Sequence, residues 1–118
     1  MRKTRKIRGG NSNIQIRYNT NIMNNSFKTK ESTSIKPNIK LLNIPLSTMI
    51  MYDPDAIVPE YVHYLVTNIV NGDITTGTTV LSYMGPAPPS GSGIHRYIFE
   101  QLQQVSPINI LLSDRSNF

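Results

Sequence analysis

The stretch MYDPDAIVPEYVHYLVTNIVNGDITTGTTVLSYMGPAPPSGSGIHRY, from Met51 to Tyr97, decides the fold of this chain. It contains both histidines of the sequence and an Asp-Pro-Asp motif, within segments that otherwise read as buried β-structure. Charged and imidazole side chains are costly to bury unless they have polar partners. Their grouping therefore predicts a polar pocket inside a β-protein.

Two strands in and beside this stretch have the strongest patterns. Residues 47–52 form a nearly continuous apolar run, which is typical of a strand buried on both faces. The proline of Asp-Pro-Asp then ends the strand, because it fixes φ and donates no hydrogen bond. Residues 61–70 are predicted to be a central strand. Asn71-Gly72 follows it and predicts a hairpin to a strand near residues 78–84.

Alternation along the strands assigns the candidate site residues to faces. His63 is expected to share a face with the other odd-numbered residues of the strand 61–69. Residues 94–102 are predicted to form a further strand, on which His95 and Tyr97 face one way and Arg96 the other. If the histidine face lines a pocket, Arg96 cannot contact the same ligand.

Shorter segments complete the expected β-structure. Residues 14–18 alternate strictly and predict a half-buried strand. Residues 37–41 begin with proline and predict an edge strand, and residues 27–30 are expected to form a short strand between turns rich in asparagine. No internal repeat is visible, so the 118 residues predict one domain.

The positive net charge belongs to the start of the chain rather than to its body. The chain carries 12 basic and 7 acidic residues, a net charge of +5, and five of the basic residues lie within the first eight positions. We therefore expect a basic disordered tail at residues 1–13 and a formally neutral domain at residues 14–118. The tail is expected to be a solubilising terminus; attraction to nucleic acid or anionic lipid is the alternative.

Composition also narrows compartment and chemistry. The chain has no cysteine, which excludes disulfides and thiolate catalysis and fits a reducing compartment, so we expect a cytoplasmic protein. No apolar run approaches the roughly 20 residues that span a bilayer, and the basic start lacks the apolar segment of a secretory signal. Histidine spacings typical of metal sites are missing, so we expect neither a metal nor a cofactor.

The residues alone leave the roles of the polar groups open. The Asp53-Pro54-Asp55 carboxylates fit either a turn in which they accept backbone N–H groups or a pair that orients histidines, and spacing favours the turn. A lone histidine such as His63 is more often a satisfied core residue than a ligand contact. The loop 85–93, with three prolines and three glycines, fits an ordinary surface loop or an anion-binding turn with exposed amides.

The order of these motifs resembles the phosphatidylethanolamine-binding protein family, which includes the Raf kinase inhibitor proteins and flowering regulators. The resemblance rests on Asp-Pro-Asp-Ala, the histidine-aromatic strand, Gly-Pro-x-Pro-Pro and Gly-x-His-Arg-Tyr, and it covers roughly residues 14–112. It implies an all-β fold, a Greek-key β-sandwich of two antiparallel sheets. It also implies a small anion pocket for phosphoryl head groups.

The resemblance also implies which residues line that pocket. Its expected ligand-binding residues are Asp53, Asp55, His63, Ala87, Pro88, Pro89, His95 and Tyr97. In this interpretation the carboxylates orient the imidazoles, while the histidines and the tyrosine donate to phosphoryl oxygens.

Three features depart from the family pattern. Ile57 stands where the family usually has proline, and Ala87 stands where many members have glycine before the paired prolines. The segment 111–118 is similar to the point where typical members continue into a further strand and a helix near the pocket. We therefore expect the C-terminal helix to be reduced or missing and one pocket wall to be incomplete.

Three classes of function compete at this point. The resemblance favours a non-catalytic regulatory module that binds a phospholipid head group or a phosphorylated peptide and modulates a protein kinase or a protease. A hydrolase built on His63, His95, Asp53 and Asp55 is less favoured, because no nucleophile motif accompanies them. Binding of nucleic acid or a membrane surface through the tail is the third class, and a nucleic-acid partner is not expected.

Overall fold

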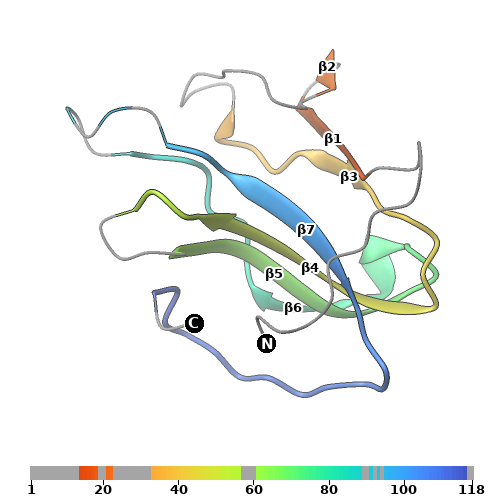
Figure 1. Ribbon diagram of the computed structural model, residues 1–118. Helices are drawn as coiled ribbons and strands as arrows, with labels where there is room; N and C mark the ends of the chain where they lie inside the picture. Colours follow the sequence, from red (N-terminus) through yellow and green to blue (C-terminus); the bar gives the residue numbers. More distant parts are fainter. Residues whose placement is uncertain are drawn as a thin grey trace.

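The computed structural model describes residues 14–18, 21–22, 33–56, 61–88, 91, 93 and 95–116, with the backbone alone at 21–22. The described residues form two antiparallel sheets (Figure 1). The strands are β1 (Gln15–Tyr18), β2 (Asn21–Ile22), β3 (Asn38–Lys40), β4 (Leu46–Asp53), β5 (Tyr61–Val70), β6 (Thr78–Leu81) and β7 (Ile98–Gln103). A short 3₁₀ turn, η2 (Ile74–Thr76), lies between β5 and β6.

The larger sheet has the strand order β6-β5-β4-β7. The consecutive strands β4, β5 and β6 run antiparallel, and β7 returns to lie beside β4, which is a Greek key. The two strands with the strongest apolar patterns, β4 and β5, occupy the centre, where both of their edges are paired. The predicted all-β Greek-key fold is therefore confirmed.

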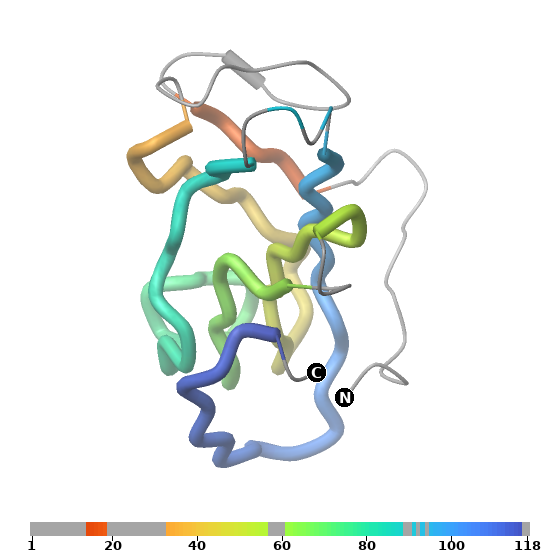
Figure 2. The backbone as a smooth tube through the Cα atoms, turned by 90° about the vertical axis from the view of Figure 1, so that its left-hand side faces the viewer, coloured from red at the N-terminus to blue at the C-terminus, as the bar shows by residue number. Residues whose placement is uncertain are grey.

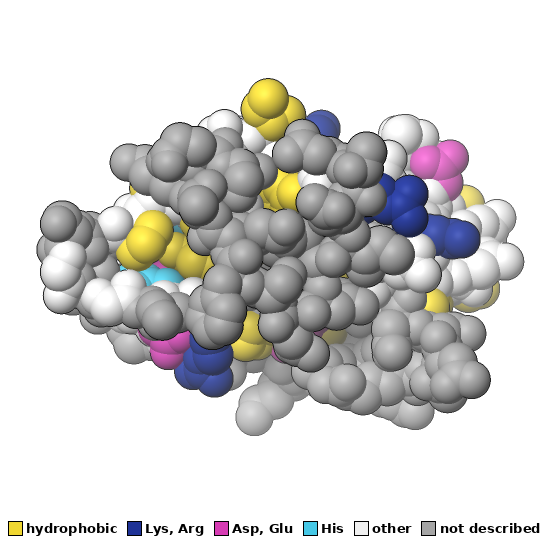
Figure 3. Space-filling model, turned by 90° about the horizontal axis from the view of Figure 1, so that it is seen from above, with side chains coloured by type: hydrophobic (Ala, Val, Ile, Leu, Met, Phe, Trp, Pro, Cys, Tyr) yellow, Lys and Arg dark blue, Asp and Glu magenta, His cyan; other side chains and the backbone are white. Residues whose placement is uncertain are grey.

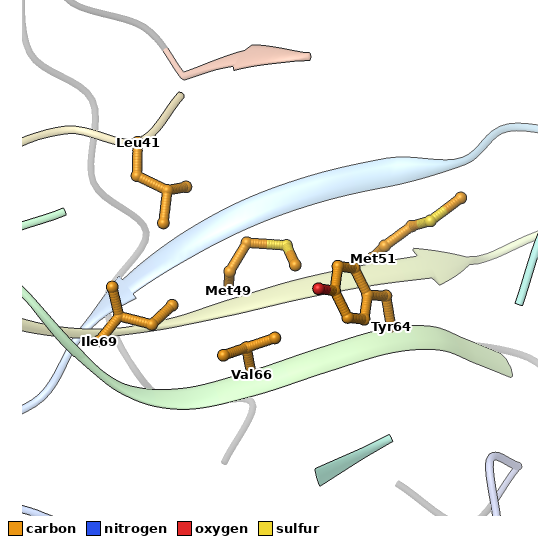
Figure 4. Packing of buried hydrophobic residues seen from close by; sticks show 6 residues of the cluster. All are labelled: Leu41, Met49, Met51, Tyr64, Val66 and Ile69. Carbon is orange, nitrogen blue, oxygen red and sulfur yellow. The ribbon is translucent and has the colours of Figure 1, made fainter. Parts of the chain in front are cut away.

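The smaller sheet, β2-β1-β3, covers one face of the larger sheet. The core between them is formed by apolar side chains of both layers, shown in Figure 4: Leu41, Met49, Met51, Tyr64, Val66 and Ile69. Leu41 follows β3 at the end of the smaller sheet, while the other five project from β4 and β5. The predicted edge position of the 37–41 strand is confirmed, since β3 pairs only with β1 among the described strands.

A second core lies on the opposite face of the larger sheet. Ile50, Val62, Leu65, Leu81 and Leu102 form it, and Leu112 packs against it from the C-terminal segment. Figure 2 shows this segment, in dark blue, folding back alongside the strands after β7. Apolar side chains thus cover both faces of β4 and β5, which explains their continuous apolar sequence.

Strand β5 contains irregularities that the alternation did not predict. Its pairing with β4 shifts register between Met51–Tyr64 and Tyr52–Val62, so His63 is an extra residue on β5. Such a bulge reverses the facing of the residues that follow it. As a result Leu65 packs in the second core rather than on the face of Tyr61, and the predicted common face of the odd-numbered residues is wrong for Leu65.

Two predicted connections need correction. The turn at Asn71-Gly72 continues through η2 before β6 begins, and β6 ends at Leu81 rather than near Met84. The last strand begins at Ile98, so residues 95–97 belong to an irregular segment instead of a strand.

The predicted strand at 27–30 and the tail at 1–13 lie outside the described residues. No helix in the described ranges is long and apolar enough to cross a membrane.

Candidate functional site

The topology brings four chain segments to one end of the larger sheet. Strand β4 ends there at Asp53, β5 starts there at Tyr61, β6 leaves there after Leu81, and β7 starts there at Ile98. Because neighbouring strands run antiparallel, the end of one strand lies beside the start of the next. The Asp-Pro-Asp turn and both histidine segments are therefore neighbours in space, although up to about 40 residues of sequence separate them.

Asp53 is a buried carboxylate at this end. It is 3% exposed and lies on the face of β4 that also carries Met49 and Met51. Its Oδ1 accepts a hydrogen bond from the backbone N–H of Asp55 at 2.7 Å. Its Oδ2 accepts one from Nδ1 of His95, also at 2.7 Å. The carboxylate thus performs both functions considered from the sequence: it closes the turn and it orients an imidazole.

The Asp53–His95 contact is removed from water, since the two side chains are only 4% and 5% exposed. An ionised carboxylate only accepts hydrogen bonds, so Nδ1 of His95 carries the proton. The ring nitrogen that remains for a ligand is Nε2.

His63 is fixed in a similar way by a different partner. Its Nδ1 lies 2.7 Å from the backbone carbonyl of Met84, which only accepts, so Nδ1 donates and Nε2 again remains for a ligand. The backbone of Met84 also donates to the carbonyl of His63 at 2.8 Å. Burial lowers the pKa of His63, although the Met84 carbonyl and Asp53 act in the opposite direction and Arg115 adds a further lowering.

The ring of Tyr97 lies near both histidine rings. Its ring centroid is 5.2 Å from that of His63, in an edge-to-face arrangement, and 6.4 Å from that of His95, in a stacked one. Burial, together with Asp53 and Asp55, raises the pKa of Tyr97 to about 12. The phenol therefore stays protonated at neutral pH and can donate a hydrogen bond.

Asp55 does not share the role of Asp53, which corrects the expectation that both carboxylates orient imidazoles. Its two oxygens accept from Nε and Nη2 of Arg96 at 2.9 Å each, and one of them also accepts from the Arg96 backbone N–H at 2.7 Å. These bonds lower the pKa of Asp55 to about 2. The Arg96 side chain is 69% exposed, whereas the His95 ring is buried.

The proline-rich loop is placed only in part. Ala87 is exposed and Pro88 is half-buried, while Pro89 lies outside the described residues. Seen from above in Figure 3, histidine atoms reach the surface beside hydrophobic side chains, near an acidic and a basic side chain. No group of three or more His, Cys, Asp or Glu side chains within the described ranges is arranged to hold a metal ion.

Sequence reasoning missed two residues that support the site. Met84 acts through its backbone, which no side-chain pattern reveals. Arg115 donates from its guanidinium to the carbonyls of Val62, His63 and Ser82, and nothing in its sequence surroundings indicates this. Tyr61, whose ring lies 5.2 Å from that of His63, was expected on the same face.

These features define a class of protein: a Greek-key β-sandwich with paired, oriented imidazoles at one end of its larger sheet. Comparison with known protein families identifies the family. The model of the family described as phosphatidylethanolamine-binding protein matches residues 12–115, which is most of the chain. The chain belongs to the phosphatidylethanolamine-binding protein family, and membership supports a binding or regulatory role in general terms.

Proposed function

We propose that the protein is a non-catalytic binding module that holds a phosphoryl group in a pocket formed by Asp53, His63, His95 and Tyr97. The observation that supports this most directly is that two imidazoles from separate segments lie near one tyrosine ring, each with Nδ1 already engaged. Both rings therefore keep Nε2 as the nitrogen for a ligand. A site with this arrangement offers two ring nitrogens and a phenol to one small anion.

The chemistry of these groups makes binding depend on protonation. With Nδ1 bonded to a fixed acceptor, Nε2 donates to a phosphoryl oxygen only when the ring is an imidazolium. The nearest arginine on the same segment, Arg96, is paired with Asp55. Among the described residues proposed to form the pocket, the side chains that can carry positive charge are thus the histidines. We therefore expect modest affinity for the anion at neutral pH.

The direction of the pH effect follows from His63. Its pKa lies below the ordinary value of 6.5 because it is buried, so the free ring takes up a proton only in more acidic solution. A bound anion favours the charged ring and raises that pKa. Binding should therefore strengthen as the pH falls below about 6.5.

The test is calorimetric titration with phosphorylethanolamine at pH 7.5 and pH 5.5. Inorganic sulfate is titrated in parallel, because its charge does not change in this interval whereas a phosphoryl group gains a proton near pH 6. We expect both anions to bind more tightly at pH 5.5, His95→Ala to weaken binding strongly, and the matched control Arg96→Ala to leave it unchanged. Equal sulfate affinity at both pH values, or equal losses in the two variants, would contradict the proposal.

The same phosphoryl chemistry is carried by lipids and by phosphorylated peptides. Sedimentation with vesicles that contain phosphatidylethanolamine and titration with a phosphoserine peptide separate the two sources. As part of the proposal, the occupied pocket controls contact with a protein kinase or a protease. The His95→Ala variant should then lose that contact together with ligand binding.

A further inference from the structure

Arg115 makes an unusual set of contacts on the side of β5 that faces β6. Its Nη1 donates to the carbonyls of Val62 at 3.2 Å and His63 at 3.0 Å, and its Nη2 donates to the carbonyl of Ser82 at 2.8 Å. Its own backbone carbonyl accepts from the N–H of Val62 at 2.8 Å. One residue of the C-terminal segment thus bonds both backbone groups of Val62 and the carbonyl of His63.

These contacts lie where the pairing of β5 with β6 ends. Their regular pairing ends at Leu65 and Leu81, just before the bulge at His63. Beyond that point the carbonyls of Val62 and Ser82 have no strand partner in the pairing of β5 and β6, and at the buried Val62 a carbonyl without a partner would be costly. The planar guanidinium, with its fixed fork of donors, takes the place of the missing ladder bonds.

We propose that Arg115 is a positioning residue for His63: it fixes the bulge from which the imidazole projects and so sets the ring against Tyr97. The inference rests on the proposed function, because positioning matters only if His63 contacts a ligand. The His63 carbonyl is held from two sides, by Nη1 of Arg115 and by the N–H of Met84. Met84 in turn accepts from the His63 ring, so the backbone and the side chain of His63 are held by one connected network.

Charge gives Arg115 a second, separable effect. Among the described residues, those that face His63 are Tyr61 on its own strand, Tyr97 before β7, Asp53 at the end of β4 and Arg115 from the C-terminal segment. Asp53 favours the imidazolium, and Arg115 opposes it. Removal of the charge should raise the pKa of His63, whereas removal of the fork alone should leave that pKa nearly unchanged.

Two substitutions separate geometry from charge. Arg115→Lys keeps the charge and loses the fork, while Arg115→Gln loses both; Arg17→Gln, on the exposed side of β1, removes one charge elsewhere and is the control. Each variant is titrated with phosphorylethanolamine and with sulfate from pH 5 to pH 8, and the pKa of His63 is read from its imidazole NMR signals. Thermal unfolding is recorded for each.

Both Arg115 variants should bind at pH 5 roughly tenfold more weakly than wild type, the effect of one misplaced charge-assisted hydrogen bond. In addition, Arg115→Gln should raise the pKa of His63, and Arg115→Lys should not. Variants that unfold at lower temperature but keep the wild-type affinity and the wild-type His63 pKa would overturn the inference.

The wild-type titration reports separately on the proposed function. Failure of the wild type to bind either anion contradicts that function, whereas wild-type binding with unchanged Arg115 variants contradicts only the role of Arg115. The NMR measurement of the His63 pKa needs no ligand. A His63 pKa in Arg115→Gln that equals that of the Arg17→Gln control would contradict the electrostatic contact itself.

Discussion

The replacement Asp53→Asn tests the central contact of the site with almost no change in shape. Asp53 accepts two hydrogen bonds, one from the N–H of Asp55 and one from Nδ1 of His95, each at 2.7 Å. An asparagine amide has one accepting oxygen and one donating nitrogen. One of the two donors therefore meets another donor, and the His95 ring loses its carboxylate partner.

The size of the effect follows from the burial of the pair, whose side chains are 4% and 5% exposed. A hydrogen bond to a charged group contributes about 1.5–3 kcal/mol to stability when it is screened little by water. A loss of about 2 kcal/mol lowers the melting temperature of a domain of this size by roughly 10 °C. A similar free energy lost from the imidazolium would weaken binding at pH 5.5 by roughly 30-fold.

The assay is denaturant unfolding at pH 7 combined with calorimetric titration of phosphorylethanolamine at pH 5.5. The matched control is Asp55→Asn, which removes the neighbouring carboxylate from an exposed ion pair with Arg96. Exposed ion pairs contribute little to stability, so we expect only a minor change there. The reasoning is refuted if the two variants lose stability and affinity to the same degree.

Three further outcomes are expected. Gly72→Ala should lower the melting temperature strongly, because a Cβ there would clash with the Leu42 carbonyl at a φ of +74°. Gly91→Ala, at a φ of +79°, would meet no atom of the described residues within 4 Å and should cost less. Gln101→Leu should cost about 2–3 kcal/mol in denaturant unfolding, because the buried amide satisfies both backbone groups of Leu42. The pKa of Asp55 is lowered to about 2, so its contribution to stability is present above about pH 4 and is lost between pH 4 and pH 2. Acid titration of Asp55→Asn should lack this loss, and an unchanged acid profile would argue against the ion pair.

Sequence reasoning predicted the centre of the fold because the signals there are local. Apolar runs at 47–52 and 61–70 correspond to β4 and β5, and the motifs at their ends come together as soon as those strands pair. The Greek-key arrangement agreed with the family resemblance, which the match over residues 12–115 confirms. The two histidines and Asp53 could therefore be named before the structure.

The rest depended on departures from regular geometry. Strict alternation assigned Leu65 to the face of His63, but a single extra residue in β5 moved it to the other core. Asp55 was expected beside an imidazole, and instead it bonds Arg96 because residues 95–97 precede β7 rather than belong to it. Arg115 acts on backbone carbonyls, which carry no sequence signal.

The most direct test of the central claim is a crystal structure of the protein grown at pH 5.5 with phosphorylethanolamine. The account predicts a phosphoryl group beside Tyr97, with its oxygens about 2.7–2.9 Å from Nε2 of both His63 and His95. The Nδ1 bonds to Met84 and Asp53 should persist in the complex. A phosphoryl group bound elsewhere, or bound here through groups other than the two imidazoles, would contradict it.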